Sequence, residues 1–98
     1  MPTMSWRPHR FSAFMQSNER LVVEGMACGG LGVHYNPTYY VMSVTHLASG
    51  KRLASFKTIY GAMMFAEAIL PLHPWSEHDA AVPQKLFKII HSHALKYT

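Results

Sequence analysis

The stretch Thr38–Leu70 decides the fold of this chain, and it reads TYYVMSVTHL, ASGKR, LASFKT and IYGAMMFAEAIL in four successive pieces. Alternating side chains in the first piece predict a strand over Thr38–Leu47. Ser49–Gly50 predicts a tight turn, after which Lys51–Phe56 returns as the partner strand. The face of the first strand that is expected to meet the helix is the more apolar one, made of Tyr40, Met42, Val44 and His46.

The fourth piece predicts a buried helix. Thr58 suits its N-cap because the hydroxyl can accept a hydrogen bond from an amide of the first turn. Pro71 ends it because a proline has no amide hydrogen to donate. Glu67 is the only charged residue between them, so we expect more than one neighbouring element to cover this helix. The expected core-facing stripe comprises Ile59, Ala62, Met63, Ala66, Ile69 and Leu70.

Two further strands are expected before this unit. β-branched residues predict a strand over 21–28, and Gly29, Gly30 and Gly32 predict a turn into a strand over Leu31–Tyr35. Since no helix is expected to follow these glycines, they are not expected to cradle a phosphate.

The two ends of the chain are less regular. Residues 1–20 are predicted to form either a short helix through Phe11, Phe14 and Met15 or an irregular arm laid over the sheet. Leu72–Pro83 reads as a linker in which Ser76 with Asp79 caps a single turn. Pro83 suits the first position of a final helix over Gln84–Lys96. The stripe expected on that helix is Leu86, Phe87, Ile90, Ala94 and Tyr97.

The sequence therefore predicts a single α+β domain over residues 1–98. Its core is an antiparallel sheet of three or four strands packed against one buried helix, within residues 21–72. Residues 1–20 form the arm or short helix, and residues 73–98 form the linker and a C-terminal helix that docks or mediates dimerisation.

The composition indicates an interaction protein. The 98 residues are 49% hydrophobic and only 14% charged, against about 25% charged in typical domains. Exposed apolar area is the expected result, and such area marks binding surfaces. A net charge of +4 favours anionic partners. One cysteine, no signal core and no long apolar stretch lead us to expect a soluble, cytoplasmic protein without a membrane partner.

Catalysis is not expected. His91 and His93 are two residues apart, a spacing that places them on different helix faces, and His73 and His78 match no recognised metal spacing. Cys28 is expected to be a small buried residue rather than a nucleophile. The five carboxylates show no paired arrangement. We therefore expect no enzyme activity, no metal and no cofactor.

Two kinds of binding remain open. The first is attachment to an acidic protein surface or a nucleoprotein complex, and the second is sequence-independent nucleic-acid binding through the basic hairpin. In both, Lys51, Arg52 and Lys57 are expected to contact anionic groups, and Tyr39 and Trp75 are expected to be aromatic anchors.

The run YVMSVTHLASGKR, followed by FKT and AMMFAE, resembles small hairpin-then-helix proteins carried by phages and other bacterial mobile elements. The resemblance covers roughly residues 38–75. It implies a setting in which small proteins bind and block host defence complexes, anti-CRISPR inhibitors included. It assigns no residue a role.

Overall fold

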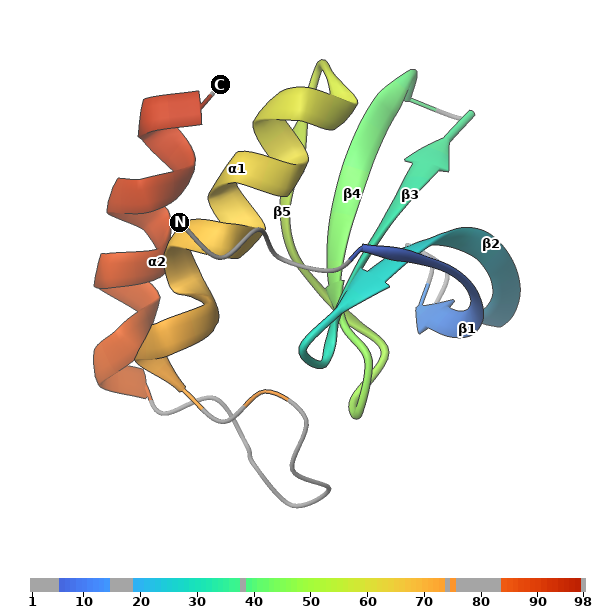
Figure 1. The fold of residues 1–98 in the computed structure, drawn as a ribbon, viewed down its shortest axis with the longest axis horizontal. Coiled ribbons are helices and arrows are strands. Elements are labelled where there is room, and N and C mark those ends of the chain that lie inside the picture. Colours follow the sequence, from blue (N-terminus) through green and yellow to red (C-terminus); the bar gives the residue numbers. More distant parts are fainter. Residues whose placement is uncertain (1–5, 15–18, 38, 74, 76–83, 98) are drawn as a thin grey trace.

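Five strands and two α-helices make up the fold in the computed structural model, which describes residues 6–14, 19–37, 39–73, 75 and 84–97. Figure 1 shows the strands on one side, α1 beside them and α2 outermost. The elements are β1 (Arg7–Phe14), β2 (Arg20–Cys28), β3 (Leu31–Asn36), β4 (Val41–His46), β5 (Lys51–Phe56), α1 (Ile59–Ile69), the short 3₁₀ helix η1 (Leu70–Leu72) and α2 (Gln84–Tyr97).

The α+β class is confirmed, and the expected strand count is wrong by one or two. All five strands form one antiparallel sheet in the order β1-β2-β3-β4-β5. The extra strand is β1, where a short helix or an arm was expected. Phe11 and Ala13 are buried, Arg10 before them is exposed and Ser12 between them is only partly buried, and this period of two belongs to a strand. Pro8 is tolerated because β1 lies at the edge of the sheet.

The β1–β2 hairpin bends out of the plane of the other strands, as Figure 1 shows. β2 pairs with β1 along most of its length but with β3 only over Met26–Cys28. Gly25 marks the bend, because a Cβ there would overlap the carbonyl oxygen of Val33. The freed part of the hairpin curls across the face of the sheet opposite α1, where the Phe11 ring lies against Gly32 and His34.

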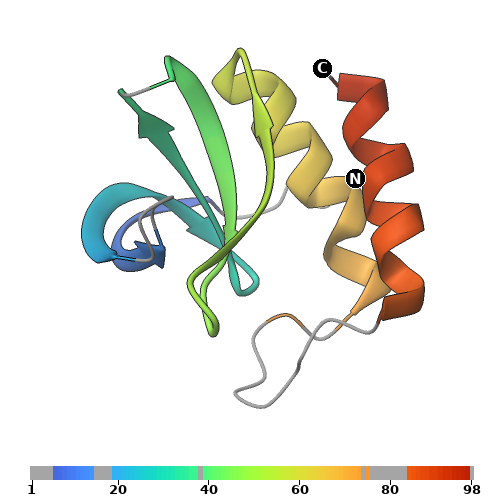
Figure 2. The same ribbon diagram turned by 180° about the vertical axis from the view of Figure 1, so that it is seen from behind.

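The core lies between β3–β5 and the two helices, and Figure 2 shows the same layers from behind. α1 packs on β3, β4 and β5, and α2 packs on α1 and β5. Full burial of each large side chain stabilises the fold by about 1.5–3 kcal/mol. The buried core comprises Leu31, Val33, Val44, Phe56, Ala62, Phe65, Ala66, Ile69, Trp75, Leu86 and Ile90.

The predicted start of α1 is confirmed. The Thr58 hydroxyl accepts a 3.0 Å hydrogen bond from the amide of Gly61. Pro71 follows the last turn and sits in η1. The predicted stripe is wrong at Ile59, which is half exposed. Phe65 is buried instead, and its ring packs against Phe56 of β5 at a centroid distance of 5.0 Å.

The second helix ends one residue later than predicted, at Tyr97. Leu86 and Ile90 are buried as expected, whereas Phe87 is exposed because it lies on the flank of α2 away from the core. The predicted cap at Ser76 and Asp79 and the first-turn Pro83 lie outside the described residues. None of the described helices is long and apolar enough to span a bilayer.

Candidate binding surfaces

All five tyrosines of the chain lie at one end of the molecule. β3 ends and β4 begins there, with Asn36 paired to Val41. β5 also ends there, since Phe56 pairs with Met42, and α1 begins three residues later. The last residue of α2 returns to the same place, because its carbonyl oxygen lies 2.8 Å from where a Cβ of Gly61 would be. The tyrosines are Tyr35, Tyr39, Tyr40, Tyr60 and Tyr97.

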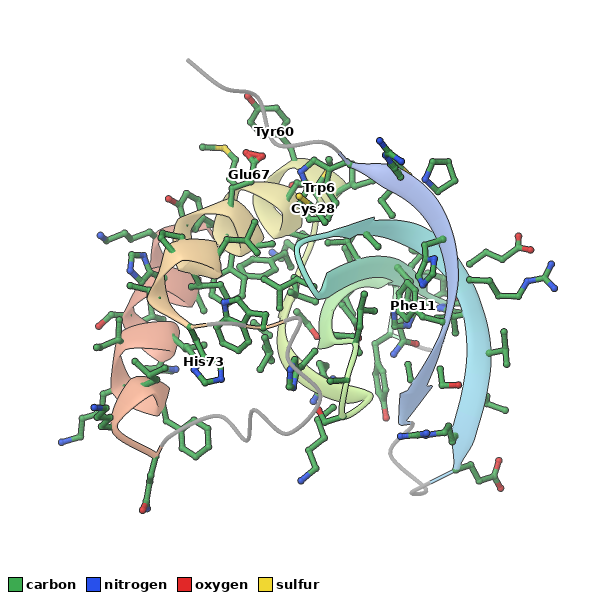
Figure 3. All side chains as sticks on the ribbon, turned by 60° about the horizontal axis from the view of Figure 1, so that its bottom comes forward. Trp6, Phe11, Cys28, Tyr60, Glu67 and His73 are labelled. Atoms are coloured by element: carbon green, nitrogen blue, oxygen red, sulfur yellow. The ribbon has the colours of Figure 1, made fainter. Side chains whose placement is uncertain are left out.

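We use the term tyrosine end for Tyr35, Tyr39, Tyr40, Lys57 and Tyr60. Tyr40 is 77% exposed and Tyr60 is 73% exposed, while Tyr35 and Tyr39 are about half exposed. Figure 3 shows Tyr60 pointing away from α1. Four large rings therefore reach solvent from three separate segments of the chain.

The backbone also contributes to this presentation. Tyr40 has φ 56°, in the left-handed region that non-glycine residues enter only rarely. The predicted strand over Thr38–Leu47 is accordingly too long, and β4 begins at Val41. Tyr39 and Tyr40 belong instead to the turn between β3 and β4, which places both rings at the tip of the sheet rather than on its two faces.

The charge at the tyrosine end has one sign. The described residues around it, 35–37, 39–41, 56–61 and 95–97, contain Lys57 and Lys96 and no carboxylate. Glu67 lies two turns further along α1, where its carboxylate accepts a 3.2 Å hydrogen bond from the Trp6 indole. Figure 3 shows Trp6 and Glu67 side by side. The tyrosine end thus combines aromatic area, hydroxyl groups and weak positive charge.

A second surface lies at the opposite end of β4 and β5. Lys51 and Arg52 are exposed at the turn between these strands. The curl of the β1–β2 hairpin brings a third cation to them, because the Arg20 guanidinium donates a 3.2 Å hydrogen bond to the carbonyl oxygen of Ser49. We call Arg20, Lys51 and Arg52 the basic turn.

The structure therefore separates the residues that were predicted to act together. Lys51 and Arg52 lie at the start of β5, whereas Lys57 follows its end, at the end of the sheet that also carries Tyr39. A strand of six residues spans about 20 Å. One small contact cannot use both groups, and the two ends are separate candidate surfaces.

Trp75 belongs to neither surface. Its side chain is only 1% exposed, and its indole donates a 2.9 Å hydrogen bond to the carbonyl oxygen of Ile69. The His46 ring lies 3.0 Å from the Trp75 carbonyl oxygen. Trp75 thus packs the segment after α1 onto β4. The expectation that Trp75 is a surface anchor is wrong. A proline-rich linker predicts exposed side chains, but the Trp75 side chain completes the core.

Sequence reasoning missed a polar strip beneath the β1–β2 hairpin. His34, Ser43 and Ser55 are neighbours on three adjacent strands, paired in register. Each has a buried side-chain atom with no hydrogen-bond partner: Nδ1 of His34, Oγ of Ser43 and Oγ of Ser55. Burial lowers the pKa of His34, because desolvation disfavours the charged imidazolium. The signal in the sequence was Ser43, near the centre of the strand predicted over Thr38–Leu47.

The described residues bring together no group of three or more His, Cys, Asp or Glu side chains of the kind that holds a metal ion. Comparison of the chain with protein-family models, with curated proteins and with solved structures finds no match.

Proposed function

We propose that this chain is a small, non-enzymatic binding protein that attaches to a protein or nucleoprotein complex through its tyrosine end. The observation that carries the proposal is the gathering of Tyr35, Tyr39, Tyr40 and Tyr60, all well exposed, at one end of the molecule. Tyrosine is among the residues over-represented in the energetic centres of protein interfaces. It offers a large rigid ring and a hydroxyl at a low entropic cost.

A specific interface would cover only a small part of this molecule. A standard protein–protein contact covers about 800 Å² of each partner. The chain exposes 6532 Å² in total, so such a contact needs about an eighth of that surface. The absence of carboxylates around the four tyrosines in the described segments, together with Lys57, favours an acidic partner surface.

The biological setting follows from the resemblance to proteins of phages and mobile elements. In that setting the bound protein is an inhibitor that occupies a working surface of a host complex, as anti-CRISPR proteins do. Plaque formation by a CRISPR-targeted phage, in a host that expresses this chain, tests that part of the proposal. An increase in plaque number of tenfold or more supports the inhibitor proposal. No increase with any of the available CRISPR types would contradict it.

The binding site itself is tested by affinity capture from the source organism. Wild-type protein is compared with a Tyr39→Ala/Tyr40→Ala variant and with a Lys51→Ala/Arg52→Ala variant as the matched control. We expect the tyrosine variant to lose captured proteins that the control retains, while both keep the wild-type circular dichroism spectrum. Equal capture by all three proteins would contradict the proposal.

Nucleic-acid binding is the second candidate, and the position of Arg20 favours it. The hydrogen bond from Arg20 to Ser49 places three cations at one turn, where the sequence alone indicated two. A salt titration with short single- and double-stranded DNA tests this candidate. Micromolar binding with a steep salt slope, weakened by Lys51→Glu/Arg52→Glu, supports it, because cations that contact phosphates release counterions. If no binding to DNA is detected at low salt, nucleic-acid binding is ruled out as the function.

A further inference from the structure

The β1–β2 hairpin covers the polar strip with apolar side chains. We call residues 7–14 and 20–25 the strap. Its inward face is largely apolar, with Phe11 and Ala13 buried. The strand face beneath it carries His34, Ser43 and Ser55, whose buried polar atoms find no partner there. Apolar groups laid over unpaired polar groups stabilise a contact poorly, because each such group has lost its hydrogen bonds to water.

The strap leads into strand pairing with the rest of the sheet at one end only. From Arg20 to Gly25, β2 does not pair with β3. The hinge side is held by the pairs over Met26–Cys28 and by the hydrogen bond of Trp6 to Glu67. Toward the free end, the hydrogen bond from Arg20 to Ser49 and the Phe11 ring hold the strap down. Figure 3 shows Phe11 pointing from β1 into the concave side of the curl.

His34 lies at the centre of this contact. It is 5% exposed, and its ring and the Phe11 ring form a T-shaped pair at a centroid distance of 5.8 Å. In the closed strap the imidazole is shielded from water on its outer side. An imidazolium in the same place would need a carboxylate or water, and β3, β4 and β5 contain no carboxylate at all.

We propose that the β1–β2 hairpin is a hinged strap and that protonation of His34 opens it. When the strap is open, water can hydrate the His34 imidazolium, and the same movement exposes Ser43 and Ser55. The closed strap requires the neutral ring. The sign follows from desolvation: the closed state binds the proton more weakly than the open one, so lowering the pH favours opening.

Other charged groups near His34 do not reproduce this behaviour. From β1, His9 stacks on Phe11 at 6.1 Å, but it is itself exposed. From β2, Glu24 pairs with Arg10 at 2.8 Å on the outward face of the strap. β4 and β5 place Ser43 and Ser55 in register with His34, and the cation nearest in that register, Arg52, pairs with Thr45 two residues beyond Ser43 and is exposed. His9 lies in the strap itself and packs on the same Phe11 ring as His34, so it is the matched control for His34.

Thiol labelling tests the proposal. The reporter is Ser43→Cys in a Cys28→Ala background, and its iodoacetamide rate is divided by that of free cysteine at the same pH. Between pH 7.5 and 5.5 we expect this ratio to rise about three- to tenfold, since one proton changes an equilibrium at most tenfold per pH unit. Adding His34→Gln should keep labelling slow at both pH values, and adding His9→Gln should leave the rise intact.

Several results would overturn the proposal. They are a ratio that does not change with pH, a rise that survives His34→Gln, and labelling that becomes fast at both pH values in that variant. An equal rise for a thiol placed at Ala66, in the core, would show global unfolding instead of strap opening. If Ser43→Cys does not fold, Ser55→Cys takes its place, because the Ser55 hydroxyl is also buried under the strap.

Discussion

The carbonyl oxygen of Tyr97 lies 2.8 Å from the position that a Cβ of Gly61 would occupy. This approach joins the last turn of α2 to the first turn of α1, and it brings the C-terminal end of α2 beside Tyr60. Glycine is the residue that permits it, because any side chain would displace the α2 backbone. The tyrosine end therefore depends on a contact between two helices as well as on the sheet.

Replacing Gly61 with alanine should destabilise the protein by about 1 kcal/mol. Alanine favours a helix by about 1 kcal/mol, but displacing packed backbone costs about 1–3 kcal/mol. Denaturant unfolding measures the difference. In a chain that ends at Lys96 the obstructing carbonyl is gone, and there the same substitution should stabilise. Stabilisation in the full chain would show that the two helices do not approach as described.

The Thr58 cap should contribute about 1 kcal/mol. Thr58→Ala removes the hydroxyl that accepts from the Gly61 amide and should lower the free energy of unfolding by that amount. Thr58→Ser keeps the acceptor and should cost only a few tenths of a kcal/mol. Similar losses for both variants would mean that the methyl group, not the cap, is what matters.

The polar strip predicts an unusual response to alanine. The Ser43 hydroxyl is buried and has no partner, so Ser43→Ala should leave the stability unchanged or raise it by about 1 kcal/mol. Ser49 is the matched control, because its hydroxyl bonds with both His46 and the Lys51 amide. Ser49→Ala should destabilise by about 1 kcal/mol. Urea melts of both variants check the contrast, and a clear loss at Ser43 would contradict it.

The stability of the whole protein should fall in mild acid. Burial lowers the pKa of His34 in the folded state, whereas the unfolded chain binds the proton near the ordinary value of 6.5. The free energy of unfolding should therefore decrease as the pH falls below about 6.5, by at most about 1.4 kcal/mol per pH unit. His34→Gln should remove this part of the slope, and His9→Gln should not. Equal slopes in all three proteins would exclude His34 as the cause.

Local sequence signals predicted much of the fold. The Ser49–Gly50 turn, the Thr58 cap and the stop at Pro71 are all confirmed because each depends on neighbouring residues alone. β1 was missed because a strand at a sheet edge tolerates Pro8, and because the spacing of Phe11, Phe14 and Met15 also fits one face of a helix.

The candidate site was less predictable because it depends on the tertiary arrangement. Tyr39 and Lys57 were named, but their separation from Lys51 and Arg52 depends on which end of each strand carries them. Tyr60 joins them only through the place where α1 begins. Arg20 reaches the basic turn only because the hairpin curls at Gly25. Composition predicted exposed apolar area, and only the tertiary arrangement shows that the tyrosines share one end.

The most direct test of the proposed function is a binding titration with the captured partner. Dissociation constants are measured for wild-type protein, Tyr40→Ala and Lys51→Ala/Arg52→Ala. Tyr40→Ala should weaken binding tenfold or more, which corresponds to about 1.4 kcal/mol, and the basic-turn variant should stay within about twofold to threefold of wild type. The reverse order, with Tyr40→Ala unchanged and the basic-turn variant weakened, would contradict binding through the tyrosine end.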